Sequence, residues 1–231
     1  MAPVGSWESL SAAIQAGADA IYIGAPLFGA RQAAGNSLED IAEVVQYAHA
    51  YGVQVLVTLN TLLHEDEYSQ AVALAHALYK IGVDALIIQD LRLLDFDLPP
   101  IRLHASTQCD NRTAEDVIRL QQLGFKRVVL ARELSIQEIS DIHRAVAVYS
   151  TEFKEEPIEL EVFVHGALCV SYSGKCFISE VLSGRSANRG ACSQYCRMAY
   201  DLLDANMQEV VDDDGKAIHQ RYLLSLQDMD R

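Results

Sequence analysis

Residues 38–60 read LEDIAEVVQYAHAYGVQVLVTLN, and this stretch contains one complete helix–strand unit. Its first part has the apolar spacing of an amphipathic helix, and a short apolar run follows that ends on Asn60. Gly52 lies between the two, and glycine accepts the left-handed backbone that a helix C-terminus often requires. The stretch therefore predicts a helix followed by a buried strand.

The same unit recurs along the chain. Further copies are SWESLSAAIQAGADAIYIGA (6–25), EYSQAVALAHALYKIGVDALIIQD (67–90) and AEDVIRLQQLGFKRVVLARE (114–133). Helix starts carry capping-box spacing or close to it at Ser37 with Asp40, Thr113 with Asp116, and Ser135 with Glu138. Short strands that alternate with helices indicate right-handed βαβ units and a parallel sheet.

The predicted strands are continuous apolar runs, which is typical of strands covered on both faces. They are YIG (22–24), VQVLVTL (53–59), ALIIQ (85–89), RLHAS (102–106), RVVLA (127–131) and IELEVFVH (158–165), with a further short strand in MAPV (1–4). A GxGxxG fingerprint and a GxxxxGK[ST] loop are both absent from the sequence, which weakens a nucleotide-binding doubly wound reading. The expected fold class is α/β, a TIM-barrel-like parallel barrel that is incomplete because a last strand is missing.

Polar residues follow the predicted strands. They are Asn60, Gln89, Asp90, His104, Ser106, Gln108, Arg132, Glu133 and His165. In a (β/α) barrel the C-terminal ends of the strands surround one mouth, where functional side chains gather. We expect His104, Arg132, Glu133 and His165 to position substrate and transfer protons there, since histidine and glutamate suit acid–base work.

Four of the five cysteines fall within residues 165–197, HGALCVSYSGKCFISEVLSGRSANRGACSQYCR. Cys169, Cys176, Cys192 and Cys196 give the spacing C-x₆-C-x₁₅-C-x₃-C, unlike the paired C-x₂-C knuckles of many zinc sites. Thiolates also hold iron–sulfur clusters, whose spacings vary more. The pattern favours metal or cluster binding, with zinc and unliganded cysteines as the alternatives. Cys109 stands apart and is expected in or near the core.

The formal net charge of the 231 residues is −14, which argues against a protein that binds nucleic acid over its whole surface. A local basic patch exists in Lys175, Arg185, Arg189 and Arg197, which are the candidate RNA-binding residues; a solvated, charged loop is the alternative. Tyr172 or Tyr195 is available to stack on a base. The sequence shows no membrane span and no signal peptide, and we expect a cytoplasmic protein with reduced thiols.

Three segments are expected. Residues 1–165 form the (β/α) units, 166–200 form a cysteine-rich cluster-binding loop, and 201–231 form a β-hairpin with an acidic turn at 212–215 and a truncated continuation of the barrel. Open strand edges in an unclosed barrel would favour oligomers.

Residues 161–179, EVFVHGALCVSYSGKCFIS, resemble the signature of the peptidase U32 family. The matching positions are Glu161, Phe163, Gly166, Cys169, Gly174, Cys176 and Ser179. LHASTQCD, VVLAREL and SGRSANRGACSQYCR look most like the family's bacterial branch required for 5-hydroxycytidine in 23S ribosomal RNA. The resemblance implies a TIM-barrel-like catalytic domain and hydroxylation without molecular oxygen. It also implies prephenate as hydroxyl donor and a cluster, 4Fe–4S, on Cys169, Cys176, Cys192 and Cys196.

Two other functions remain open at this point. The family name comes from collagenase-like members, which suggests a peptidase or metallopeptidase, although the chain has neither an HExxH helix nor a GxSxG elbow. A non-catalytic scaffold is the third reading, because an unclosed barrel leaves strand edges exposed.

Overall fold

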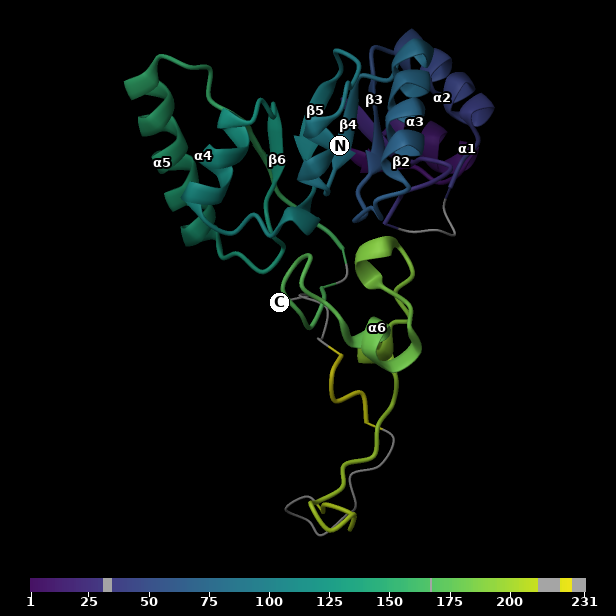
Figure 1. Cartoon of the computed structure of the whole chain (residues 1–231), viewed down its shortest axis with the longest axis vertical. Helices are drawn as coiled ribbons and strands as arrows, with labels where there is room; N and C mark the ends of the chain where they lie inside the picture. Colours follow the sequence, from purple (N-terminus) through teal and green to yellow (C-terminus); the bar gives the residue numbers. More distant parts are fainter. Residues whose placement is uncertain (31–34, 167, 212–220, 226–231) are drawn as a thin grey trace.

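A computed structural model describes residues 1–30, 35–166, 168–211 and 221–225. Seven strands form one sheet in the order β1-β2-β3-β4-β5-β6-β7, and every neighbouring pair is parallel. Helices intervene between the strands and cover the outside of the curved sheet (Figure 1). The predicted α/β, TIM-barrel-like class is confirmed, and the short strand predicted in MAPV is present.

The strands are β1 (Ala2–Pro3), β2 (Ala20–Gly24), β3 (Gln54–Leu59), β4 (Ala85–Ile88), β5 (Arg102–Ala105), β6 (Arg127–Val129) and β7 (Glu159–Glu161). The α-helices are α1 (Trp7–Gln15), α2 (Leu38–Ala50), α3 (Tyr68–Ile81), α4 (Ala114–Gln122), α5 (Ile136–Phe153) and α6 (Ile178–Ser183). Short 3₁₀ helices follow β4 and β5 and interrupt the cysteine-rich segment.

Local sequence signals set the helix ends. Ser37 and Ser135 form reciprocal capping boxes with Asp40 and Glu138, as their spacing predicts. Thr113 also caps its helix, by accepting from the backbone N–H three residues on. Each cap satisfies backbone N–H groups that a helix start leaves unpaired.

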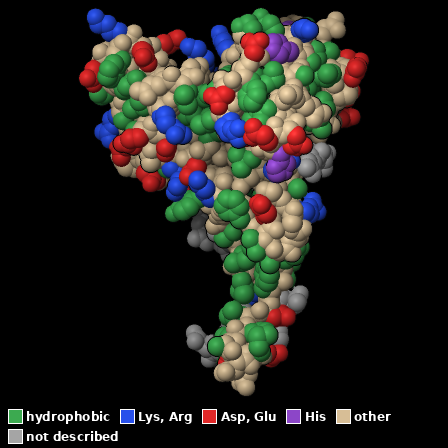
Figure 2. Space-filling model, in the orientation of Figure 1, with side chains coloured by type: hydrophobic (Ala, Val, Ile, Leu, Met, Phe, Trp, Pro, Cys, Tyr) green, Lys and Arg blue, Asp and Glu red, His purple; other side chains and the backbone are tan. Residues whose placement is uncertain are grey.

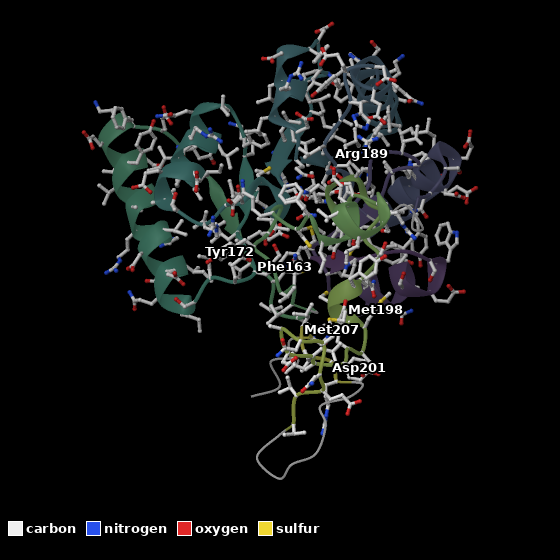
Figure 3. The ribbon with its side chains drawn as sticks, turned by 60° about the horizontal axis from the view of Figure 1, so that its bottom comes forward. Phe163, Tyr172, Arg189, Met198, Asp201 and Met207 are labelled. Carbon is white, nitrogen blue, oxygen red and sulfur yellow. The ribbon has the colours of Figure 1, made fainter. Side chains whose placement is uncertain are left out.

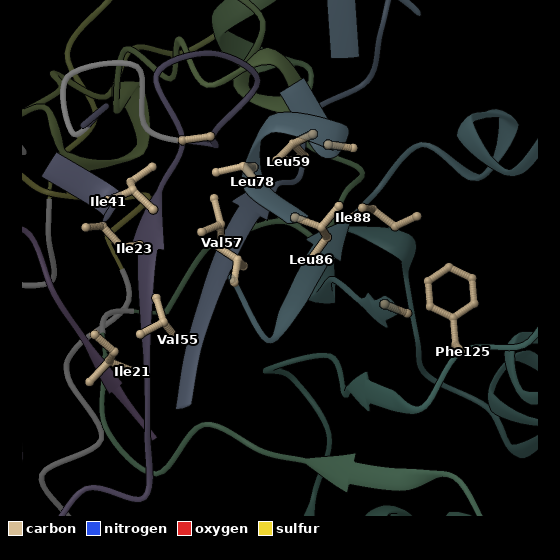
Figure 4. Close-up of a cluster of buried hydrophobic side chains, with 14 of the residues drawn as sticks. Ile21, Ile23, Ile41, Val55, Val57, Leu59, Leu78, Leu86, Ile88 and Phe125 are labelled. Atoms are coloured by element: carbon tan, nitrogen blue, oxygen red, sulfur yellow. The ribbon is translucent and has the colours of Figure 1, made fainter. Parts of the chain in front are cut away.

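The main core lies between the sheet and the helices. Ile21, Val55, Val57, Leu86 and Ile88 point from the strands toward buried residues of α2 and α3 (Figure 4). The alternate strand positions form a smaller buried cluster on the inner face: Ala20, Leu56, Ala85 and Ile87, with Tyr22 packed against them. Burial on both faces explains why these strands lack a polar alternation.

The two outer strands of the sheet approach each other. Met1, which precedes β1, lines a cavity of about 600 Å³ together with Leu160 and Glu161 of β7. The sheet therefore curls far enough to bring its first and last strands around one space, as in a barrel. No pairing between β1 and β7 is present among the described residues, and oligomerisation through these edges stays a prediction.

The cysteine-rich segment lies beyond the C-terminal ends of the strands, and the following residues extend away from the barrel (Figure 1). Hydrophobic side chains cover much of this narrow extension in Figure 2. Antiparallel bridges join Tyr200 to Arg221 and Leu203 to Glu209, so the hairpin expectation agrees with the described pairing. The acidic turn predicted at 212–215 lies outside the described residues. No described helix combines the length and the apolar character needed to cross a bilayer.

Candidate functional site

Four cysteines from the segment after β7 surround a single cavity of about 620 Å³. Cys169, Cys176, Cys192 and Cys196 all line it, although 27 positions separate the first from the last. The barrel contributes Asn60 from the end of β3, and Thr107 and Gln108 from the end of β5. The cavity therefore lies between the mouth of the barrel and the cysteine segment, where the strand-end pattern predicts a site.

The first cysteine pair is held against the loops that follow β5 and β6. Ser173 donates to Glu133 through its backbone N–H and its hydroxyl, both over 2.9 Å. Gly174 donates its N–H to Gln108 Oε1 over 3.0 Å. Because these two residues lie between Cys169 and Cys176, the contacts fix the position of that pair relative to the barrel.

Gly174 passes so close to the barrel that no side chain fits. Its backbone has φ +75°, and an added Cβ would lie 2.1 Å from the carbonyl oxygen of Gln108. The left-handed backbone and the lack of space both require glycine.

The stretch just before the second cysteine pair is held against the loop that follows β3. Arg189 forms a bidentate ion pair with Glu67, at 2.8 and 2.7 Å, and also donates to the carbonyl of Leu62. Asn188 accepts from the N–H of Leu62. The hydrogen bonds from Arg189 lower the pKa of Glu67 from 4.5 to about 2. Tyr172 and Arg189 lie on opposite sides of the segment in Figure 3, so the two attachments hold different flanks of it.

Hydrogen-bond donors surround the cysteine sulfurs. Arg132 donates from Nη2 to Cys169 Sγ over 3.2 Å, and the N–H of Gln194 lies 3.4 Å from Cys192 Sγ. Burial, followed by the charges of the other three cavity cysteines, raises the pKa of Cys196. The Cys196 thiol is thus close enough to the other three for their charges to affect its pKa.

These four thiols do not form a single-ion site in the described part of the chain. Among the described residues, no three His, Cys, Asp or Glu side chains are grouped closely enough to hold one metal ion. A tetrahedral zinc site would require all four sulfurs at about 2.3 Å from one point. Four thiols around one larger cavity have the donor chemistry and the room for a multi-atom iron–sulfur centre.

The four predicted RNA-binding cations divide into two groups. Arg185 and Arg197 line the cavity and are exposed. Lys175 instead forms an ion pair with Asp110, with Nζ and Oδ2 3.7 Å apart. Arg189 is bound to Glu67 and attaches the segment to the barrel. The Arg189 guanidinium thus binds a carboxylate in this structure, and its predicted contact with a phosphate stays a prediction.

The four predicted catalytic residues do not meet at one point. Arg132 lines the cavity, and Glu133 next to it is bound to Ser173. His165 is exposed, because β7 ends at Glu161 rather than at 165 as predicted. No histidine lines the described part of the cavity.

His104 lies in a separate cavity of about 470 Å³ at the N-terminal ends of the strands. It pairs in register with Ile87 and Arg127, so it points into the barrel interior. Burial, followed by the positive charge of Arg127, lowers its pKa to about 4. The expectation that His104 joins Arg132 at the mouth is wrong: the imidazole is 5% exposed, and its Nδ1 has no hydrogen-bond partner in the described residues.

Other residues at the strand ends form hydrogen bonds with the loops around the barrel mouth. Asp90 accepts from the N–H of Leu63 and from the hydroxyl of Tyr68, and Gln89 donates to the carbonyl of Gln108. Cys109 is nearly buried against the carbonyls of Ile88 and Gln89 at the end of β4, and burial raises its pKa to about 12. Its predicted place in or near the core is confirmed.

Two important residues are missing from the sequence predictions. Asn111 is fully buried and donates to the carbonyls of Ser106 and Val129, which joins the ends of β5 and β6. Arg112 lies over the ring of Tyr172 at 4.2 Å from the ring centroid. Both residues follow a strand that ends in polar residues, but Val129 and Tyr172, the partners that lie in other elements, are distant in sequence.

Known proteins resemble this chain over most of its length. The sequence profile of peptidase family U32 matches residues 5–231. The chain is 51% identical over 220 residues to the 23S rRNA 5-hydroxycytidine C2501 synthase of Escherichia coli (strain K12), covering 95% of this chain and 31% of that protein. It is 38% identical over 213 residues to the tRNA hydroxylation protein P1 of Bacillus subtilis (strain 168), covering 89% and 47%. The chain thus spans about a third to a half of the length of these relatives.

The structure of the U32 peptidase Mk0906 shares the fold, with a TM-score of 0.61 and 15% sequence identity. The match covers 97% of this chain and 88% of that one.

Proposed function

The chain belongs to peptidase family U32, and on that premise we propose that it hydroxylates a cytidine of 23S ribosomal RNA at C5 without molecular oxygen. The observation that carries the proposal is the meeting of four thiols around one cavity at the barrel mouth. The similarity to a 5-hydroxycytidine synthase, at 51% identity, supports the choice of base.

An iron–sulfur cluster, 4Fe–4S, would be held by Cys169, Cys176, Cys192 and Cys196. When bound, such a cluster supplies one-electron transfer. Arg132 would donate to a ligand sulfur, and the attachments at Ser173 and Arg189 would keep the two cysteine pairs at a fixed separation. Zinc is less well supported, because the described cysteines are not grouped around one point.

The RNA strand would meet the cavity through Arg185 and Arg197, which line it. The net charge of −14 makes these local cations important, since phosphate binding rests on cationic contacts. The cytidine must be unpaired or turned out of its helix to reach the barrel mouth. A ribosomal RNA substrate would place the reaction in the cytoplasm.

The hydroxyl donor would be prephenate, whose two carboxylates suit a cavity lined by Arg132, Arg185 and Arg197. Cleavage of the prephenate C–O bond with loss of CO₂ leaves phenylpyruvate and supplies the oxygen at the oxidation level of hydroxide. Conversion of the cytidine C5–H to C5–OH then releases two electrons and one proton. An external electron acceptor is therefore part of the proposal, and it must take up both electrons for each cytidine converted.

A peptidase function has less support from the site. Hydrolysis by a cysteine nucleophile would require a histidine beside the thiol. In the described part of the cavity, the side chain that contacts Cys169 is Arg132, and histidines are absent from the lining.

The proposal is tested by complementation. An Escherichia coli strain that lacks its 5-hydroxycytidine synthase receives the gene for this protein, and the 23S rRNA nucleosides are analysed by mass spectrometry. We expect 5-hydroxycytidine to return with the parent gene and to stay absent with Cys176→Ser. Stable protein that carries a cluster but leaves 5-hydroxycytidine at the level of the deletion strain would overturn the proposal. A colourless, zinc-containing protein after anaerobic purification would contradict its cofactor.

A further inference from the structure

Tyr172 forms a fixed aromatic surface with two residues of the loop between β5 and α4. The Arg112 guanidinium lies 4.2 Å from the centroid of the Tyr172 ring. Asp110 holds that guanidinium in a bidentate pair, with Nε–Oδ1 at 2.5 Å and Nη2–Oδ2 at 3.0 Å. Asp110, Arg112 and Tyr172 are called the Tyr172 platform below. Since the arginine is itself fixed, the ring is held in one orientation.

The platform lies at the edge of the cysteine cavity. Tyr172 lines the cavity together with the four cysteines, whereas Arg112 does not. The guanidinium therefore covers the ring from outside the cavity, and the Tyr172 side chain remains 58% exposed. In Figure 3 the residue lies on the flank of the segment that faces α4 and α5.

Tyr195 also lines the cavity, but its surroundings differ. Its side chain is half-buried, and its backbone carbonyl accepts from the hydroxyl of Tyr200 over 2.7 Å. Among the described residues, no ring or guanidinium contact orients the Tyr195 side chain. Of the two tyrosines that the sequence offers for stacking, Tyr172 is the one whose ring is both fixed and exposed.

An exposed ring beside a cationic cavity suits a planar, anionic polymer. Nucleobases stack on aromatic rings whatever their sequence, and phosphates pair with nearby arginines. Arg185 and Arg197 line the same cavity, and neither forms an ion pair within the described residues. The cavity thus combines a surface for one base with cations for the adjoining backbone.

We propose that the Tyr172 platform is a stacking subsite for an unpaired nucleobase of the RNA strand that enters the cysteine cavity. The inference rests on the proposed RNA substrate, and it adds the residue that receives the base. Arg112 acts as a positioning residue, because it holds the ring and does not line the cavity.

The test measures binding rather than hydroxylation. A short fluorescein-labelled single-stranded RNA with one central cytidine is compared with the same RNA carrying an abasic site at that position, by fluorescence anisotropy on anaerobically purified protein. The variants are Tyr172→Leu, which removes the aromatic face, and Tyr172→Phe, which keeps it. Tyr79→Leu is the matched control, since Tyr79 is an exposed tyrosine on α3 that does not line the cavity.

We expect Tyr172→Leu to weaken binding of the intact RNA by about 5- to 150-fold, and binding of the abasic RNA by less than about twofold. Tyr172→Phe and Tyr79→Leu should remain within about twofold of the parent for both RNAs. Equal losses for intact and abasic RNA would overturn the proposal, because the ring would then only shape the loop. Unchanged binding by Tyr172→Leu, or a parent protein that binds neither RNA, would overturn it as well. Base-dependent binding without 5-hydroxycytidine formation would retain the platform and remove only the proposed reaction.

Discussion

Arg132 donates a hydrogen bond from Nη2 to Cys169 Sγ over 3.2 Å, which joins the end of a barrel strand to the first cavity cysteine. A donor to a ligand sulfur stabilises the more negative, reduced form of an iron–sulfur centre and so raises its reduction potential. If the hydrogen bond is about 1 kcal/mol stronger in the reduced state than in the oxidised state, the reduction potential of a one-electron couple rises by about 40 mV.

Arg132→Gln is therefore expected to lower the potential of the reconstituted protein by about this amount, and Arg132→Lys to lower it less. The measurement is a redox titration followed by electron paramagnetic resonance. Arg92→Gln, on an exposed arginine paired with Glu65, is the control and should leave the potential unchanged. Identical potentials in Arg132→Gln and the parent would show that the bond has no electronic role.

Gly174→Ala is expected to displace the first cysteine pair. The new Cβ would lie 2.1 Å from the Gln108 carbonyl oxygen on a left-handed backbone, so the loop must move. We expect a loss of about 2–4 kcal/mol in the free energy of unfolding and a clear drop in bound iron per chain.

Gly184→Ala is the matched control for that substitution. Gly184 also has a positive φ, +67°, but no atom lies within 4 Å of an added Cβ. Gly184→Ala should lower the free energy of unfolding by about 1 kcal/mol and leave the iron content unchanged. Equal effects of the two substitutions would mean that backbone conformation, rather than the close approach to Gln108, is what matters.

Glu67→Gln should remove a pH-dependent part of the stability. The pKa of Glu67 is lowered from 4.5 to about 2 by Arg189, so the folded state favours the carboxylate. The stabilisation is complete above pH 4.5 and is lost as the pH falls toward 2. Allowing for partial solvent exposure, we expect a loss of about 2 kcal/mol at pH 7.

Chemical denaturation of parent and Glu67→Gln between pH 7 and the acid limit of folding provides the measurement. The difference in stability should shrink as the pH falls below 4.5. Glu65→Gln serves as control, because the Glu65–Arg92 pair is exposed and should contribute less than about 0.5 kcal/mol. A pH-independent difference would argue against the Arg189–Glu67 ion pair as its source.

Cys109 should resist alkylation in the native protein. Its pKa is raised to about 12 by burial, so almost no thiolate exists near pH 8. Cys169 and Cys192 are exposed and should react with iodoacetamide in protein treated with a metal chelator. Mass spectrometry of the digested protein gives the extent of modification at each position. Modification of Cys109 as fast as that of Cys169 would contradict its placement.

The fold could be predicted closely because its signals are local. The helix–glycine–strand unit of residues 38–60 contains its own cap, its own stop and its own apolar run, and the structure follows it from Ser37 to Leu59. The end of β7 was the exception. VFV continues the apolar pattern after Glu161, but these residues are exposed, and periodicity cannot show that a strand has left the sheet.

The site could be predicted only in part. The clustering of the cysteines follows from their spacing, and the barrel mouth follows from the parallel topology. Which residue forms an ion pair or hydrogen bond with which other residue does not follow from either. Arg189 finds Glu67 across 122 positions of sequence, and no local pattern distinguishes such an arginine from one that awaits a phosphate. His104 lies two residues before Ser106 at the strand end, yet it faces the barrel interior at the level of Arg127.

The two cysteine pairs are attached to different parts of the barrel. Ser173 and Gly174, between Cys169 and Cys176, bind the β5 and β6 loops, whereas Arg189, just before Cys192, binds the β3 loop. An inorganic centre bound to all four cysteines would be a crosslink between those parts. Its insertion should therefore slow unfolding and proteolysis of the whole barrel, far from the loop that binds it. Iron supply would then govern the lifetime of the protein as well as its chemistry.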